Sequence, residues 1–150
     1  AFGHASRASE YVAGYLRWNE YSRKLGEFHQ KYDLQMTPTL ALPPARIGEI
    51  ATPKWQHVAM KILLALGLSR MILKSGMIEQ MVRENLKWVP FTQIGNLTGA
   101  PAMSVPLHWT AGGLPLGVHF VAAHGGEGLL FRLAAQLEKA KPWFNRVPEL

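Results

Sequence analysis

The segment from Leu116 to Ala123 is a nearly continuous run of apolar residues, LGVHFVAA, with glycine-containing turn sequences before and after it. Such a run is typical of a β-strand that is buried on both faces of a sheet. A second strand is predicted just upstream, where Met103, Val105 and Leu107 alternate with other residues. The chain is therefore expected to fold around a sheet that contains these two strands.

Helical periodicity dominates most of the remaining sequence. The segment from Ser9 to Lys31 is predicted to form one long amphipathic helix. Its stripe at three- and four-residue steps is expected to pack in the interior, with base stacking as the less favoured alternative. The stripe consists of Tyr11, Tyr15, Trp18, Ser22, Leu25 and Phe28.

Two shorter helices are predicted in the middle of the chain, and one near its end. The first starts at Thr52-Pro53, a hydroxyl cap followed by proline, and ends or bends at Gly67. The second covers about Ser69 to Lys87, and the pair is expected to pack as a helical hairpin. A last helix follows Gly126 and is stopped by Pro142.

The residues between the first two predicted helices indicate a short strand and a loop. Residues 32–36 are predicted to form a short strand that is stopped by Thr37-Pro38, and the proline-rich Leu40–Gly48 segment forms an irregular connection. The expected organisation is a helix (1–31), a strand and proline-rich loop (32–51), a helical hairpin (52–89) and a loop-strand-strand-helix segment (90–150).

Composition narrows the possible functions. The 150 residues are 48% hydrophobic and 17% charged, which is typical of one globular domain, and the lack of cysteine excludes disulfides, thiolate metal sites and a thiol nucleophile. The net charge of +6, with ten of the 16 basic residues in the first 75, makes a nucleic acid an alternative partner. No long apolar span or export signal is visible, which favours a cytoplasmic protein and no membrane partner.

The usual catalytic motifs are not found. No two histidines lie at helical three- or four-residue spacing, so no metal site is predicted. The sequence contains neither a phosphate-binding glycine loop nor a G-x-S-x-G motif. Ser104 lies within a predicted strand and is not expected to act as a nucleophile, and Asp33 is the only aspartate.

The run from Phe91 to Pro106, FTQIGNLTGAPAMSVP, resembles the C-terminal end of the amidase-signature enzymes. That family commonly shows F-T-x-x-x-N-x-T-G-x-P-A-x-x-x-P, then G-L-P-x-G, here at 113–117, and an acidic residue that opens a last helix, here Glu127. The earlier Tyr32-Asp33-Leu34 and Thr37-Pro38-Thr39 are also similar to the family pattern. The resemblance covers about Ser9 to Trp143.

The resemblance implies an α/β chain that forms the C-terminal part of the amidase-signature fold, with outer helices and two to three strands of a mixed central sheet. It also implies hydrolysis of a carboxylic amide to an acid and ammonia or an amine, through an acyl-enzyme and without a cofactor. Family members use a Ser–cis-Ser–Lys triad, with the nucleophile in a Gly/Ser-rich run upstream of the matching part. This chain has only isolated serines and no such run, so no catalytic residue is assigned and the chain alone is expected to be inactive.

The expected contribution of this chain to the enzyme is one wall of the substrate pocket. Gln93 and Asn96 are its candidate polar contacts, and Trp88 and Phe91 its candidate apolar contacts. The alternative role of Asn96 is to cap a turn, because Asn96 and Thr98 can both satisfy backbone groups where the chain turns from helix to strand. Its expected partners are a small-molecule amide and the N-terminal part of the same enzyme, with self-association through exposed strand edges. His119 departs from the family, which often has glutamine there. The alternative is a basic helical module that binds an acidic partner such as nucleic acid.

Overall fold

The structure is a computed structural model that describes residues 7–51, 53–68 and 76–146. The described residues belong to two compact units, one within Ala1–Tyr15 and Ala45–Trp88, the other within Leu16–Pro44 and Val89–Leu150. The second unit contains the sheet and the segment that carries the family resemblance, so it is described first.

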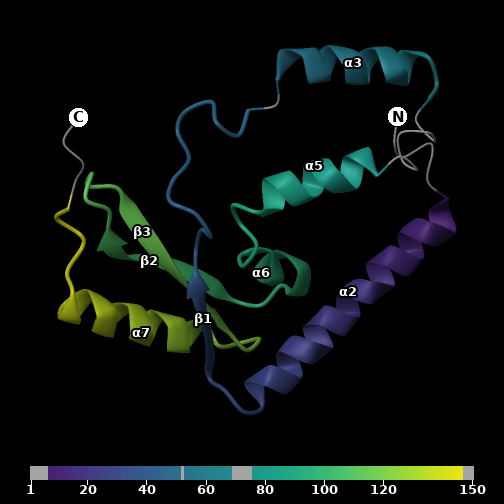
Figure 1. The fold of residues 1–150 in the computed structure, drawn as a ribbon. Coiled ribbons are helices and arrows are strands. Elements are labelled where there is room, and N and C mark those ends of the chain that lie inside the picture. The colour runs from purple at the N-terminus through teal and green to yellow at the C-terminus, as the bar shows by residue number, and fades with distance from the viewer. Residues whose placement is uncertain (1–6, 52, 69–75, 147–150) are drawn as a thin grey trace. The chain divides into compact units, whose positions relative to one another are not determined.

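The sheet of the second unit has three described strands, all antiparallel (Figure 1). Strands β1 (Leu34–Pro38) and β2 (Ala102–Trp109) both pair with β3 (Pro115–Ala122), in the order β1-β3-β2. The apolar run identified in the sequence is therefore the central strand, and its last four residues, HFVA, are all buried. The two predicted strands of this region are confirmed, and the pairings described are antiparallel.

Strand β1 differs from its prediction. Thr37 and Pro38 do not stop the strand, because Pro38 still pairs with Val118 and the Thr39 amide donates to the Gly117 carbonyl at 2.9 Å. The strand also starts later than predicted, since the Tyr32 amide donates to the Phe28 carbonyl and prolongs the preceding helical turn. Proline is tolerated in an edge strand because its missing N–H does not break a hydrogen bond in the interior of the sheet.

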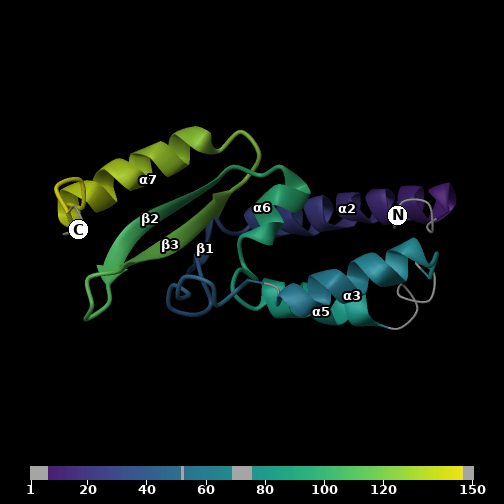
Figure 2. The ribbon, with the colours of Figure 1, turned by 90° about the horizontal axis from the view of Figure 1, so that it is seen from above.

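Helices cover both faces of this sheet. Helix α7 (Glu127–Ala140) lies along one face (Figure 2), where Leu130 packs with Val105, Phe120 and Ala122. On the other face, Val121 packs with Leu25 of α2 (Ala8–His29), with Ala100, and with Ile94 of α6 (Gln93–Thr98). Both faces of β3 are thus packed, as its sequence predicts.

The apolar stripe of the long helix α2 is mostly exposed, which corrects the sequence prediction. Leu25 is buried, whereas Tyr11 and Tyr15 remain 72% and 57% exposed. Leu25 packs with Val121 of the central strand and with Ala100. Helical periodicity identified the apolar face but not the extent to which the chain covers it.

The first unit contains α3 (Lys54–Ala65) and α5 (Met77–Leu86). Pro53 is the N-cap residue of α3 and not its first helical residue, and its carbonyl accepts from the Gln56 and His57 amides. The predicted cap Thr52 and the predicted helical residues 69–75 lie outside the described part of the chain.

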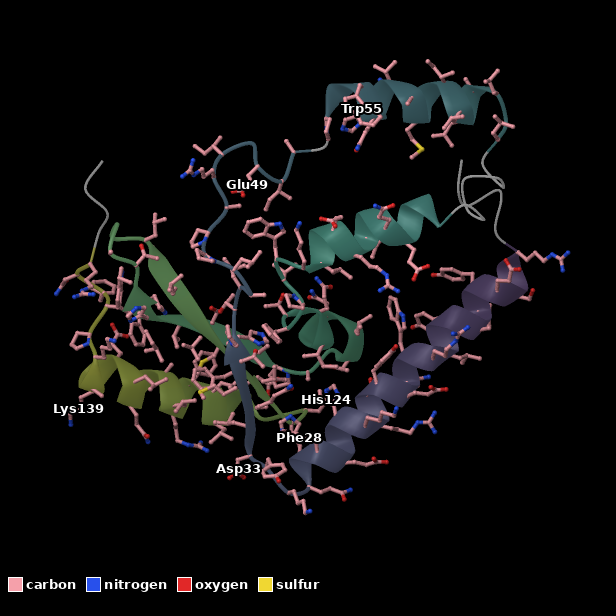
Figure 3. All side chains as sticks on the ribbon, in the orientation of Figure 1. Phe28, Asp33, Glu49, Trp55, His124 and Lys139 are labelled. Carbon is pink, nitrogen blue, oxygen red and sulfur yellow. The ribbon has the colours of Figure 1, made fainter. Side chains whose placement is uncertain are left out.

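The apolar stripe of α3 is largely exposed. Trp55 and the C-cap residue Leu66 are 69% and 67% exposed, and Figure 3 shows Trp55 on this helix. The packing of a hairpin stays a prediction.

Candidate functional site

The short helix α6 carries most of the predicted pocket wall. Gln93 is its first residue and Asn96 lies three positions later, so both amide side chains share one side of the helix. Ile94 turns inward to the core, and a Cβ placed on Gly95 would lie 3.4 Å from the Cβ of Ala102. The absence of side-chain atoms on Gly95 thus lets α6 rest closely on the start of β2.

The turn between α6 and β2 is fixed by its own residues. The Thr98 hydroxyl donates to the Ile94 carbonyl at 2.7 Å and accepts from the Ala100 amide at 3.3 Å. Gly99 has a φ of 69°, in the left-handed region that favours glycine. The role expected of Thr98, satisfying backbone groups where helix turns to strand, is confirmed. The Asn96 side chain makes no such bond within the described part of the chain.

The four predicted wall residues are divided between the two units. Trp88, half-buried, ends the first unit, whereas Phe91, Gln93 and Asn96 belong to the second. Asn96 is exposed, Phe91 is 37% exposed, and Gln93 is half-buried. The structure therefore brings the last three together around α6, and their role as a substrate wall stays a prediction.

A ladder of polar side chains crosses the sheet on the face opposite α7. His119 on β3 is paired with Thr37 on one side and Ser104 on the other. Its Nδ1 lies 3.3 Å from the Thr37 hydroxyl, and the Ser104 and Thr39 hydroxyls form a hydrogen bond of 2.5 Å. Position 119 therefore makes a polar contact, with histidine in place of the family's frequent glutamine.

Burial changes the acid–base properties of this ladder. His119 is only 5% exposed, and desolvation of its charged form lowers its pKa below the ordinary histidine value. A neutral imidazole is therefore favoured at neutral pH. The neutral imidazole can donate a hydrogen bond to a hydroxyl group or accept one from it, but it contributes no charge to the sheet.

The structure also contains a pocket that no motif in the sequence indicates. His29 and Gln30, in the last turn of α2 and just after it, line a pocket of about 270 Å³ together with His124, which follows β3. Figure 3 shows the labelled His124 beside this end of α2, the end that also carries the labelled Phe28. Spacing along the sequence could not reveal this pair, because tertiary folding brings the two histidines to one pocket. None of the predicted wall residues lines it.

None of the described helices is both long enough and apolar enough to cross a bilayer.

Comparison with known proteins gives a consistent result. The family model Amidase matches residues 3–131. "Putative amidase AmiC" of Mycobacterium leprae (strain TN) is 33% identical over 93% of this chain, and 6-aminohexanoate-cyclic-dimer hydrolase of Pseudomonas sp. (strain NK87) is 35% identical over 79% of it. A solved structure of 6-aminohexanoate cyclic dimer hydrolase complexed with substrate matches 96% of this chain with a TM-score of 0.73 and 30% identity.

The matches cover much less of the relatives than of this chain. They account for 25% and 21% of the two relatives and 27% of the solved structure, so this chain spans about a quarter of their length. The fold of helices and antiparallel strands agrees with amidase-signature structures over that part of their length. A family model that matches residues 3–131 includes the motif at Phe91–Pro106, and it places this chain in the amidase family.

Proposed function

We propose that this chain is the C-terminal part of an enzyme that hydrolyses a carboxylic amide to an acid and ammonia or an amine through an acyl-enzyme. The observation that carries the proposal is the Amidase match over residues 3–131, which includes the motif at Phe91–Pro106. The relatives named as amidases and as a cyclic-dimer hydrolase support amide bonds as the substrate class. The same match favours this function over the basic module for nucleic acid.

The proposed enzyme needs residues that this chain does not supply. A Ser–cis-Ser–Lys triad requires two serines and a lysine, and the serines of this chain are isolated along the sequence. We therefore propose that the chain alone is inactive and that a longer polypeptide, N-terminal to it, supplies the nucleophile. The exposed apolar stripes of α2 and α3 support such a partner, since a large covering surface would bury them.

The proposed contribution of α6 is to bind substrate. Asn96 and Gln93 present amide groups that can donate and accept hydrogen bonds, which suits an acyl or amine substituent near the scissile bond. Phe91 and Trp88 would provide apolar contacts to the same substrate. We assign these four side chains to binding and none to the chemical step.

A hybrid enzyme tests this function. The chain would replace the matching segment of 6-aminohexanoate-cyclic-dimer hydrolase, and hydrolysis of a panel of amides would be measured. We expect amide hydrolysis by the hybrid, with Asn96→Ala and Gln93→Ala raising KM more than they lower kcat. Asn145→Ala, at an exposed position outside α6, is the matched control and should leave both constants unchanged.

Two outcomes of this experiment would contradict the proposal. A folded hybrid that hydrolyses no amide would contradict the proposed function. Equal kinetic constants for Asn96→Ala, Gln93→Ala and the control would contradict the assignment of the pocket wall but not the proposed function. A cytoplasmic location stays a prediction, which fractionation of cells would test.

A further inference from the structure

Two hydroxyl groups meet above Gly117 of the central strand. Ser104 extends from β2 on one side and Thr39, the residue after β1, from the other, and their oxygens are 2.5 Å apart. A Cβ on Gly117 would lie 2.5 Å from each of these oxygens. The glycine therefore leaves the space in which the two hydroxyls form their hydrogen bond.

This hydroxyl pair, Ser104 and Thr39, can bind a third group. Each hydroxyl can donate one hydrogen bond and accept two, and the bond between them uses one donor and one acceptor. One hydroxyl proton is thus left for an acceptor outside the pair, and lone pairs are left for a donor. Ser104 is exposed and Thr39 is half-buried, so a ligand can reach the pair from solvent.

The hydroxyl pair lies on the sheet face that carries α6. Gly95 of α6 rests against Ala102, and Ser104 is two residues further along β2, on the same face. Two residues of a strand span about 7 Å. A small molecule that contacts the proposed substrate wall on α6 can therefore extend to the hydroxyl pair as well.

This part of the described sheet face and α6 contain no charged side chain. The sheet residues here are Gln35, Thr37, Thr39, Ala102, Ser104, Gly117, His119 and Val121, and α6 has the sequence QIGNLT. His119 is the titratable residue among them, and burial lowers its pKa and favours its neutral form. A carboxylate or ammonium group placed here would lose hydration without gaining an opposite charge. The surroundings therefore suit an uncharged group that donates and accepts hydrogen bonds.

We propose that Ser104 and Thr39 extend the substrate pocket and bind an uncharged hydrogen-bonding group of the substrate, such as a second carboxamide. A carboxamide offers its oxygen to the remaining hydroxyl proton and its N–H groups to the hydroxyl lone pairs. The proposal rests on the amide hydrolysis proposed above, and it adds the chemical class of a second group on the substrate. The hydroxyl pair takes no part in the chemical step.

The hybrid enzyme described above tests this contact with adipamide, adipamate and hexanamide. Their carbon chains are equally long and differ in the second end group, which is a carboxamide, a carboxylate or a methyl group. We expect the highest kcat/KM for adipamide. Ser104→Ala and Thr39→Val should each raise the ratio of the KM for adipamide to the KM for hexanamide by about two- to ten-fold, through the lost hydrogen bond.

Two further variants separate binding from support of the sheet. Thr39→Ser keeps the hydroxyl, so its KM ratio should lie closer to that of the unmodified hybrid than the ratio of Thr39→Val does. Ser9→Ala, at an exposed position of α2, is the matched control and should leave the ratio unchanged. If Ser104→Ala and Thr39→Val change the constants for adipamide and hexanamide equally, the hydroxyl pair only joins the strands. That result would overturn this proposal and leave amide hydrolysis standing.

Backbone amide NMR of the 150-residue chain decides the question if the hybrid hydrolyses no amide. Adipamide should then cause saturable shifts of the Ser104 and Gly117 amide resonances, whereas adipate, its charged counterpart, should not. The shift of Gly117 should be weakened in Ser104→Ala and retained in Ser9→Ala. Such a result would support the contact while amide hydrolysis fails, and the absence of these shifts would overturn the contact as well.

Discussion

The imidazole Nδ1 of His119 lies 3.3 Å from the hydroxyl oxygen of Thr37, across the pair of strands β1 and β3. This contact joins the central strand to an edge strand at a buried position, where solvent cannot stabilise a positive charge. The stability of the sheet should therefore depend on the protonation of His119.

The first prediction concerns pH. Burial lowers the pKa of His119 in the folded chain, so the unfolded chain binds this proton more tightly. The free energy of unfolding should be unaffected by His119 above pH ~6.5, and should fall as the pH drops from there toward the folded-state pKa. Urea unfolding of the unmodified chain and of His119→Gln, above and below that pH, measures the difference. Equal pH dependence of the two would contradict the prediction.

The second prediction concerns Gly117, which faces two hydroxyl groups. A Cβ at this position would lie 2.5 Å from both Ser104 Oγ and Thr39 Oγ1. Gly117→Ala should therefore lower the free energy of unfolding by about 1–3 kcal/mol. Gly14→Ala is the control, because a Cβ there would meet nothing within 4 Å. Replacing this glycine of helix α2 by alanine should raise the free energy of unfolding by about 0.5–1 kcal/mol. Chemical denaturation that gives the same sign for both would refute this explanation.

The third prediction compares two phenylalanines. Phe120 is 6% exposed in the core under α7, whereas Phe131, on α7 itself, is 76% exposed. Phe120→Ala should cost about 3–5 kcal/mol of stability through lost burial and the cavity left behind. Phe131→Ala should change it by less than about 0.5 kcal/mol. Similar losses of stability in denaturation experiments would mean that α7 covers the sheet by a different face.

Features that depend on residues close in sequence can be predicted from the sequence, whereas features that depend on tertiary packing cannot. Strand β3 and the turn at Thr98 depend on nearby residues, and both were predicted. The continuation of β1 through Pro38 depends on that strand's place at the sheet edge, which no local pattern encodes. Likewise, the meeting of His29 and His124 depends on how α2 packs beside the end of β3. The exposure of the apolar stripe on α3 depends on which residues lie against it, and the local helical pattern does not specify them.

The fourth prediction is self-association of the 150-residue chain. Trp55, Ile62 and Leu66 leave a broad apolar stripe on α3 in contact with water, and exposed patches of this kind promote association. Sedimentation velocity should show a concentration-dependent increase in mass. Replacing Ile62 and Leu66 by serine should reduce it, whereas Glu79→Gln, at an exposed charged position of α5, should not. A monomer at all concentrations would contradict the prediction.

The central claim is that this member of the amidase family supplies part of an enzyme and not its nucleophile. Labelling of the purified 150-residue chain with a serine-directed fluorophosphonate tests it most directly, with an intact amidase-signature enzyme as the positive control. The account predicts no labelling of this chain, and none of its serines should be modified. Stoichiometric labelling of one serine in the folded chain, lost on denaturation, would contradict it.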